Sequence, residues 1–268
     1  MPKISVTSYS LHRHIGKEIS LLDFPRLARE EFGLDAIELI NSHIESVERE
    51  YLDALKNNVA QNRQRIVHIS AGHGNISQRD EKQRLKDVQV LLGWLDVASY
   101  LGAPAIRIDT GSQQGDPDLS ITIDSYERLA ARARKLGLKI TLENHGGISW
   151  DPQNIVQIIE TVGTDVMGTC PDLMNYLALD ANDVEGVYAK LRVIAPYAVI
   201  LHAKGYEFGP DGEDKHIEYA RLAEIFESFD GYWSVEFEGP GDQYDGVRKT
   251  IALIRKHVRA RSPAVRSA

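Results

Sequence analysis

Short apolar segments alternate with longer segments of helical periodicity along the whole chain. The apolar segments predict eight β-strands, over Ile4–Ser8, Ala36–Leu39, Arg65–Ile69, Ala105–Asp109, Lys139–Glu143, Val166–Cys170, Ala198–His202 and Trp233–Phe237. They recur roughly every 30 residues, which is the length of one strand–helix unit. Between the first two strands, Phe24, Leu27, Ala28 and Phe32 fall at helical spacing and predict a helix with one apolar face.

The same spacing predicts helices between later pairs of predicted strands, within residues 91–101, Ile123–Leu136 and Val184–Ile194. Three predicted helices are followed by a glycine, the residue that best adopts a left-handed helix end, at Gly33, Gly102 and Gly137. Eight such units in about 250 residues favour a closed (β/α)8 TIM barrel over an open doubly wound sheet. An open sheet that binds a dinucleotide would carry GxGxxG after its first strand, and Ser5–His12 lacks these glycines.

Composition narrows the class of protein further. The chain has 268 residues, and we expect one barrel domain over residues 1–258 and a frayed tail over residues 259–268. A single cysteine excludes a disulfide framework and suits a reducing, cytoplasmic location. The net charge of −8 disfavours nucleic acid as a partner, since nucleic-acid binding needs a basic surface. No apolar segment approaches the ~20 residues of a membrane span, and no signal peptide is recognised.

Residues with metal-binding side chains stand at the ends of the last four predicted strands. They are Glu143, Asp172, His202 and Glu236, spaced 29, 30 and 34 residues apart. Chemistry in a TIM barrel takes place at the carboxyl ends of the strands, and alternation along each strand directs these side chains inward. Carboxylates crowded at this end of a barrel, its mouth, repel one another unless a cation or a shared proton reduces the repulsion. Three oxygen ligands and one imidazole suit one divalent ion, Mn²⁺ or Mg²⁺ first, with Co²⁺ or Zn²⁺ left open.

The motifs around these residues resemble a known family. Segments 142–147 (LENHGG), 201–204 (LHAK) and 234–239 (SVEFEG) are similar to the xylose isomerase-like barrel superfamily, specifically its sugar phosphate isomerase/epimerase group. The resemblance implies that Glu143, Asp172, His202 and Glu236 hold the metal. Many members carry a histidine three residues after the strand-six aspartate. Asn175 stands there in this chain, so a substrate contact at this position is not assured.

Other polar residues near the predicted mouth are candidates for binding substrate. Lys204 is in phase with His202 and would contact a substrate oxygen, unless it reaches out to solvent. Glu38 ends the second strand facing inward and is a candidate to orient substrate. Arg107 is a candidate contact too, although an ion pair with Asp109 is the favoured interpretation of that side chain. Glu238 lies beyond the eighth strand and is expected to support the site rather than to ligate.

Two activities fit this constellation. The first is a metal-dependent isomerase or epimerase of a keto sugar or small hydroxy-keto acid, in which Glu143 and Glu236 move a proton through an enediolate. The alternative is a lyase on the same metal site, such as a dehydratase or a 3-keto-glycoside-cleaving enzyme. In dehydratase-type relatives a histidine in the position of His145 is the base. The expected partner is a small sugar-like molecule, and a homo-oligomer is left open.

Overall fold

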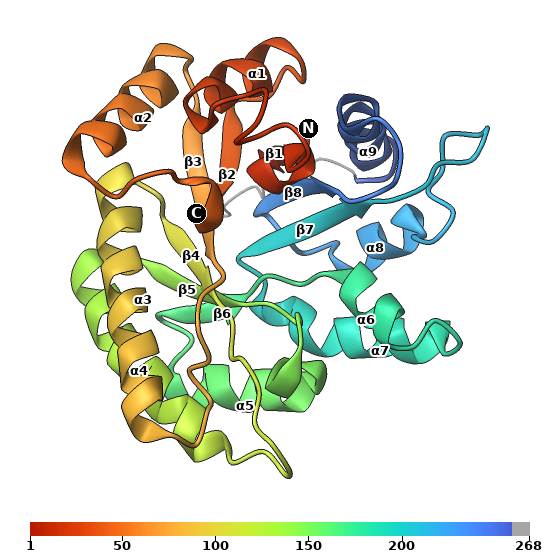
Figure 1. Cartoon of the computed structure of the whole chain (residues 1–268). Coiled ribbons are helices and arrows are strands. Elements are labelled where there is room, and N and C mark those ends of the chain that lie inside the picture. Colours follow the sequence, from red (N-terminus) through yellow and green to blue (C-terminus); the bar gives the residue numbers. More distant parts are fainter. Residues whose placement is uncertain (259–268) are drawn as a thin grey trace, which may run out of the picture.

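The computed structural model describes residues 1–258 and shows a sheet of eight parallel strands that curls on itself, with helices outside it (Figure 1). The strands are β1 (Lys3–Thr7), β2 (Ala36–Ile40), β3 (Arg65–Ala71), β4 (Ala105–Ile108), β5 (Lys139–Leu142), β6 (Met167–Thr169), β7 (Ile200–Gly205) and β8 (Tyr232–Phe237). This architecture confirms the predicted TIM barrel. The predicted tail, residues 259–268, lies outside the described residues.

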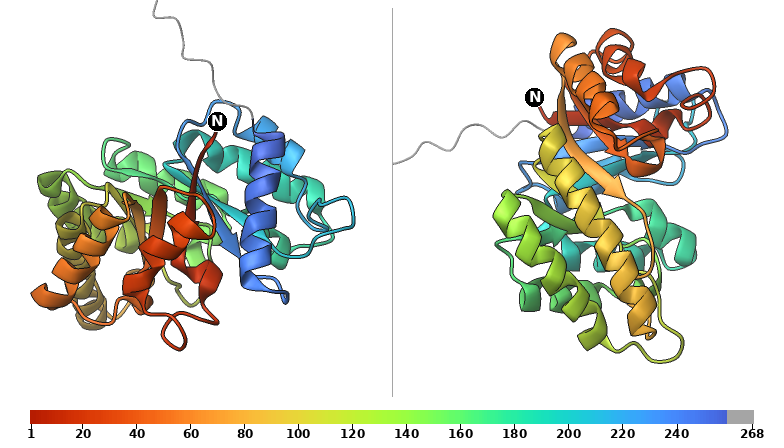
Figure 2. Two further views of the ribbon diagram at one scale, coloured as in Figure 1. Left: turned by 90° about the horizontal axis from the view of Figure 1, so that it is seen from above. Right: turned by 60° about the vertical axis from the view of Figure 1, so that its left-hand side comes forward.

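The helices of the described residues follow the strands, and all but the last connect one strand to the next. They are α1 (Phe24–Glu30), α2 (Arg49–Gln61), α3 (Glu81–Leu101), α4 (Leu119–Leu136), α5 (Pro152–Val162), α6 (Leu173–Leu179), α7 (Val184–Ile194), α8 (Tyr219–Ile225) and α9 (Gln243–His257). Short 3-10 helices are η1 (Ser8–Leu11), η2 (Leu21–Asp23), η3 (Asn41–His43), η4 (Gly147–Trp150) and η5 (Ala195–Tyr197). Figure 2 shows the two longest, α3 and α4, side by side on the outer face of the sheet. No helix within residues 1–258 has the length and apolar character needed to cross a bilayer.

Local sequence explains where the helices begin and end. The carboxylate of Asp80 accepts a hydrogen bond from the Gln83 N–H and caps the start of α3. The predicted helix-ending glycines Gly33, Gly102 and Gly137 have φ angles of 64°, 78° and 69°. These left-handed angles confirm the prediction, because a side chain at such a position would be strained.

The sheet closes between β6 and β7 by isolated bridges rather than by a continuous ladder. The order of paired strands is β6-β5-β4-β3-β2-β1-β8-β7, and Thr169 bridges Ala198 while Asp172 bridges His202. The His202 N–H donates to the Pro171 carbonyl at 3.1 Å. Closure therefore brings the carboxyl ends of β6 and β7, with two predicted ligands, into contact.

Side chains inside the barrel are arranged in layers. Ala36 and Ile200, the first residues of β2 and β7, form a small buried apolar cluster with Val67 and Cys170. One step further along, His202 on β7 pairs in register with Ser234 on β8, and Lys204 then pairs with Glu236. Residues two apart on a strand share a face, so the interior changes from apolar to polar toward the mouth. The outward residue Phe237 instead packs against Gly246 of α9.

Candidate metal centre

Four strand ends bring the four predicted ligands together. Glu143 follows β5, Asp172 follows β6, and His202 and Glu236 lie within β7 and β8. One nitrogen or oxygen atom from each lies within 4.8 Å of the other three, and all four residues are buried. The sequence spacing alone predicted this convergence, because consecutive strands of a barrel end at the same face.

Two of the three acidic residues of the cluster, Glu143 and Asp172, have one oxygen fixed by a hydrogen bond from the surrounding protein. Arg107 Nη1 donates to Glu143 Oε2 at 2.7 Å. Asp172 Oδ1 accepts from the backbone N–H of Met174 at 2.8 Å and so caps the start of α6. The Asn144 side chain, two residues after β5, supports Asp172: it donates to the Asp172 carbonyl at 2.6 Å and accepts from its N–H at 2.9 Å. These contacts leave Glu143 Oε1 and Asp172 Oδ2 facing the cluster.

The imidazole of His202 is also fixed from one side. Its Nε2 lies 3.0 Å from Glu38 Oε1, in a hydrogen bond. Its Nδ1 lies 2.5 Å from Glu143 Oε1 and 2.9 Å from Glu236 Oε2. If Nε2 carries the hydrogen, the lone pair of Nδ1 points toward the two carboxylates, the arrangement of a metal-binding histidine.

The unsatisfied atoms of this site fit a cation. Among the described residues, buried side-chain atoms without a hydrogen bond include one from each predicted ligand: Glu143 Oε1, Asp172 Oδ2, His202 Nδ1 and Glu236 Oε2. Buried polar atoms are almost always hydrogen-bonded, so such a group at one point needs an explanation. A divalent ion bound by three oxygens and one nitrogen would satisfy all four.

The electrostatics of the cluster also favour a cation. Burial raises the pKa of Asp172 to about 6 despite the nearby Lys204 ammonium. Burial also opposes ionisation of Glu143, but Arg107 and His202 outweigh it and lower its pKa to about 2. Burial lowers the pKa of His202, yet the surrounding thiol and carboxylates raise it well above its usual range. The ligands thus form a crowded acidic site that attracts positive charge.

A second buried network lies beneath His202 and is built around Glu38, which we expected to orient substrate. In the structure this carboxylate is fully buried and hydrogen-bonded to side chains of the barrel interior. Its Oε1 accepts from His68 Nδ1 at 2.8 Å and from Ser70 Oγ at 2.8 Å, and its Oε2 accepts from Ser234 Oγ at 2.5 Å. Burial opposes its charge, but His202 and His68 hold the pKa of Glu38 well below its usual range.

Arg107 makes one predicted contact and one that sequence reasoning missed. Its Nε lies 3.3 Å from Asp109 Oδ1, which is the expected ion pair. The additional bond to Glu143 joins β4 to the end of β5 and depends on the register of these strands. No sequence motif signals such a register. Cys170 was also missed as a neighbour of the site, although its thiol lies within 4.8 Å of ligand atoms of Glu143 and His202.

The remaining candidates line the mouth at different depths. Lys204 Nζ lies 3.3 Å from Asp172 Oδ2, 3.0 Å from Glu236 Oε2 and 2.9 Å from Glu238 Oε2, so it does not reach out to solvent. Asn175 is half-buried, and its Nδ2 has no hydrogen-bond partner among the described residues. His145 is 55% exposed, and its Nδ1 lies 3.8 Å from Asp109 Oδ2. It therefore stands at the rim, outside the ligand cluster.

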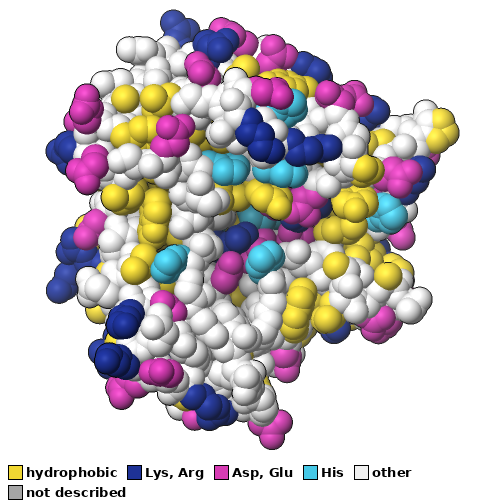
Figure 3. All heavy atoms as spheres, in the orientation of Figure 1, with side chains coloured by type: hydrophobic (Ala, Val, Ile, Leu, Met, Phe, Trp, Pro, Cys, Tyr) yellow, Lys and Arg dark blue, Asp and Glu magenta, His cyan; other side chains and the backbone are white. Residues whose placement is uncertain are grey.

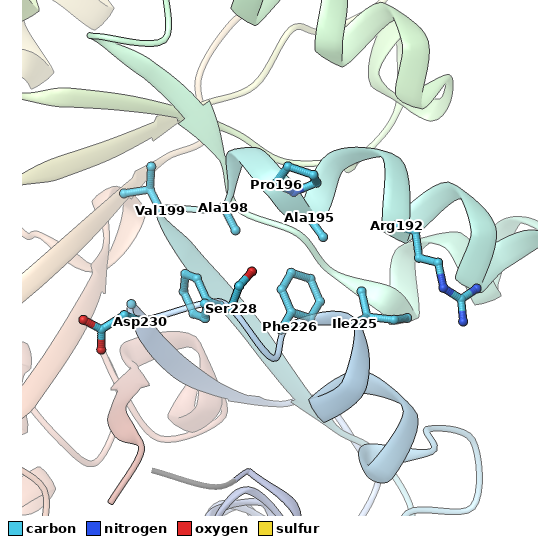
Figure 4. A pocket seen from close by; sticks show the side chains of 11 residues that line it. Arg192, Ala195, Pro196, Ala198, Val199, Ile225, Phe226, Ser228 and Asp230 are labelled. Atoms are coloured by element: carbon cyan, nitrogen blue, oxygen red, sulfur yellow. The ribbon is translucent and has the colours of Figure 1, made fainter. Parts of the chain in front are cut away.

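The molecular surface shows the site as a polar centre of one face. In Figure 3, histidine, acidic and basic side chains gather in the middle of the face, over the strands. A separate hollow of about 420 Å³ lies at the amino ends of β7 and β8, where Figure 4 shows Phe226 pointing toward Ala195. None of the unsatisfied buried side-chain atoms of residues 1–258 belongs to its lining. The chemistry therefore concentrates at the mouth.

Comparison with known proteins agrees with this architecture. No curated protein is significantly similar to the chain. Among solved structures, L-ribulose 3-epimerase has a TM-score of 0.77 at 17% identity, over 96% of this chain and 95% of that one. A xylose isomerase-like TIM barrel protein from Mycobacterium smegmatis in complex with magnesium has a TM-score of 0.71 at 18% identity, over 95% and 96%. D-psicose 3-epimerase with D-tagatose from Clostridium cellulolyticum H10 has a TM-score of 0.73 at 14% identity, over 96% and 100%.

The family itself is shown by the sequence. Residues 26–257, from α1 to the end of α9, match the family described as xylose isomerase-like TIM barrel. The match includes all four residues of the cluster as well as β2 to β8. The chain therefore belongs to the xylose isomerase-like TIM barrel family.

Proposed function

We propose that this chain is a divalent-metal-dependent isomerase or epimerase acting on a keto sugar or a small hydroxy-keto compound. The observation that carries the proposal is the cluster of four buried ligand atoms that make no hydrogen bond. Glu143, Asp172, His202 and Glu236 would hold the ion, with Mn²⁺ first and Mg²⁺, Co²⁺ or Zn²⁺ as alternatives. A bound divalent ion would polarise a carbonyl and the adjacent hydroxyl oxygen, and so acidify the carbon-bound hydrogen next to the carbonyl.

Glu143 and Glu236 would move that proton. They extend from β5 and β8, and both reach within 2.9 Å of His202 Nδ1. One carboxylate accepts the proton from carbon, and the electron pair of the broken C–H bond enters the enediolate. The other carboxyl group returns a proton. Return to the opposite face of the same carbon gives an epimer, and return to the neighbouring carbon gives an aldose–ketose isomer.

Two cations set the charge of this proton-transfer site. Arg107 holds one oxygen of Glu143 and leaves the other free. The Lys204 ammonium, only 5% exposed, lies among Asp172, Glu236 and Glu238 at the inner end of the mouth. A substrate oxygen that gains negative charge as the proton leaves would be stabilised by such a preorganised cation.

The similar structures support this class of reaction without specifying the substrate. Two of them are 3-epimerases of sugars, and a third holds magnesium. Their identities of 14–18% support a shared fold, so the choice of reaction rests on the residues of this chain.

A lyase on the same site is the second candidate. The observation in its favour is the approach of His145 Nδ1 to Asp109 Oδ2 at 3.8 Å, which gives the imidazole a carboxylate neighbour. A β-eliminating enzyme would use His145 to take the proton and expel a leaving group from the next carbon. The exposed position of His145 makes it the less favoured base.

One experiment tests the proposal. The metal-loaded protein is incubated in deuterated water with a panel of ketoses, keto-inositols and 3-keto-glycosides, and products and deuterium content are analysed by chromatography and mass spectrometry. We expect deuterium at the carbon next to the carbonyl together with an epimer or isomer, and no exchange with Glu236→Gln. Elimination products would favour the lyase. Failure of every panel member to exchange with the fully metal-loaded protein would contradict both activities.

A further inference from the structure

We infer that Glu38 is a positioning residue that presents His202 Nδ1 to the metal ion. The inference rests on the proposed function, since it concerns the same centre. Glu38 touches none of the other three ligands by hydrogen bond, and its contact with the site is the bond from His202 Nε2 to its Oε1. It acts on the metal only through the imidazole, because it is fully buried below it.

Glu38 is held more firmly than an ordinary side chain. Its two oxygens accept four hydrogen bonds, from His202, His68, Ser70 and Ser234. These donors come from β3, β7 and β8, while Glu38 itself belongs to β2. Because donors on three strands hold this carboxylate in place, it is a fixed acceptor opposite His202 Nε2. It therefore favours the ring tautomer with the hydrogen on Nε2, which leaves the lone pair of Nδ1 free.

The network extends one step further through His68. Its Nδ1 lies 2.8 Å from Glu38 Oε1 and its Nε2 lies 2.8 Å from Thr141 Oγ1. Thr141 lies on β5, two residues before Glu143. The outer network therefore links the strand of one ligand, Glu143, to the imidazole of another, and sets both relative to the centre.

The charge of Glu38 is difficult to explain by stability alone. A fully buried carboxylate loses several kcal/mol of hydration, and apolar residues of similar volume often serve a core at least as well. A metal-binding imidazole, by contrast, needs a hydrogen-bond acceptor opposite its other ring nitrogen, which orients the ring and raises its basicity. The structure thus favours a functional reason for the acid.

Glu38, His68 and His202 also have ligand-type atoms within 4.8 Å of one another. This lower group is a second candidate metal site beside the cluster of four ligands. The two groups differ in one respect. The facing atoms of Glu38, His68 and His202 Nε2 are joined by hydrogen bonds of 2.8–3.0 Å. The four ligand atoms of the upper cluster make no hydrogen bond, and their close contacts are ion pairs with one another or with Lys204. The lower group is therefore complete as a hydrogen-bond network, and one ion per chain is expected.

Glu38→Gln tests this role, because the amide keeps the shape and removes the charge. We expect Mn²⁺ affinity, measured by calorimetry, to fall 10- to 100-fold, as is typical when the hydrogen-bond partner of a metal-binding histidine is changed. In ¹⁵N NMR spectra of metal-free protein, recorded at a pH at which the His202 ring is neutral, the ring should show Nε2 protonated in the wild type and a mixture of tautomers in the variant. A merely structural role would leave this ring pattern unchanged.

Two further variants complete the test. Asp87→Asn removes another buried carboxylate, which accepts three hydrogen bonds at the start of α3, and should leave Mn²⁺ affinity unchanged. Ser70→Ala removes one donor to Glu38 and should lower affinity less than Glu38→Gln. If Glu38→Gln fails to fold, Ser70→Ala still tests whether the hydrogen bonds of Glu38 affect metal affinity.

The outcomes separate this inference from the proposed function. If the wild type binds no Mn²⁺, the metal centre itself is wrong and the role of Glu38 fails with it. If the wild type binds Mn²⁺ but Glu38→Gln and Ser70→Ala bind it equally well, with the same His202 tautomer, only the positioning role is overturned. A second ion per wild-type chain that is lost in Glu38→Gln would instead make Glu38 a ligand and overturn the inference.

Discussion

The two oxygens of an acidic ligand in this protein have different surroundings. Glu143 Oε2 is bound by Arg107 and Asp172 Oδ1 by the start of α6, whereas the other oxygen of each makes no hydrogen bond. This asymmetry orients the free oxygens before any ion arrives. At the residue scale, preorganisation rather than the mere presence of four ligands defines the centre.

Glu236→Gln tests whether the ligand is Glu236, within β8, or Glu238, just after the strand. Glu236 is buried and lies 2.9 Å from His202 Nδ1, whereas Glu238 is 30% exposed on its side chain and pairs with Lys204. We expect Glu236→Gln to lose more than about 100-fold in Mn²⁺ affinity, beyond the usual effect of an outer partner. The matched control Glu238→Gln should stay within about fivefold, because a partly exposed ion pair contributes at most ~1 kcal/mol. Equal losses in both variants would contradict this choice.

His145→Ala distinguishes the two candidate activities. An isomerase that works with Glu143 and Glu236 needs no imidazole base, so the variant should keep deuterium exchange within about tenfold of the wild type. A lyase that uses His145 would lose about 10²–10⁴ in turnover. Metal content is measured in the same samples, because a lost ion would imitate a lost base. A fully metal-loaded but inactive His145→Ala protein would move the assignment to the lyase.

At the scale of secondary-structure elements, the weakest junction of the barrel carries two ligands. β6 is three residues long and meets β7 only through isolated bridges. The Asn144 side chain reinforces this region by a pair of hydrogen bonds between the ends of β5 and β6. The metal centre thus depends on side-chain links where backbone pairing ends.

Asn144→Ala measures the strength of this link. The substitution leaves the buried N–H and carbonyl of Asp172 without their partner, which costs about 1–3 kcal/mol for each buried group left unsatisfied. We expect the free energy of unfolding, from urea titration, to fall by about 2 kcal/mol or more. Asn154→Ala is the control: its half-buried side chain donates one bond, of 3.2 Å, and should cost less than about 1 kcal/mol. An unchanged stability of Asn144→Ala would show that the link is unimportant.

The loop after β5 depends on a close backbone approach at Gly147. Its φ is +55°, and a side-chain carbon placed there would lie 2.1 Å from the carbonyl oxygen of Gly111. Gly147→Ala should therefore lose about 2–4 kcal/mol, from backbone strain and from displacement of the loop after β4. Gly102→Ala has a similar φ of +78° but no atom within 4 Å, so it should lose only about 1–2 kcal/mol. Equal losses by thermal unfolding would refute the close-packing argument.

Strand boundaries illustrate what the sequence can and cannot predict. Seven of the eight predicted strands begin within one residue of the observed start, and β7 begins at Ile200 rather than Ala198. The delay follows from η5, whose turn ends at Tyr197 and leaves Ala198 as its cap. The inward placement of His202 was still predicted correctly, because alternation along a strand does not depend on where the strand begins.

At the scale of the whole molecule, the apolar layer, the Glu38 network and the ligand cluster follow one another from the closed end of the barrel to its mouth. The ligand cluster was predictable, since each of its residues stands near the carboxyl end of the strand in one strand–helix unit. The network below it was not, because the contact of Glu38 with His202 joins residues 164 apart through the register of four strands. Arg107 likewise finds Glu143 only once the barrel has closed.

The stoichiometry of metal binding decides whether the four buried residues form a metal centre. Protein stripped with a chelator is titrated with Mn²⁺ by calorimetry, and bound metal is counted by elemental analysis. We expect one ion per chain to bind with micromolar or tighter affinity. The unfolding temperature should rise by roughly 5–10 °C at a hundredfold excess over Kd, since such binding adds about 2.7 kcal/mol. A folded protein that binds no divalent ion at micromolar concentration, and whose unfolding temperature does not change, would contradict this expectation.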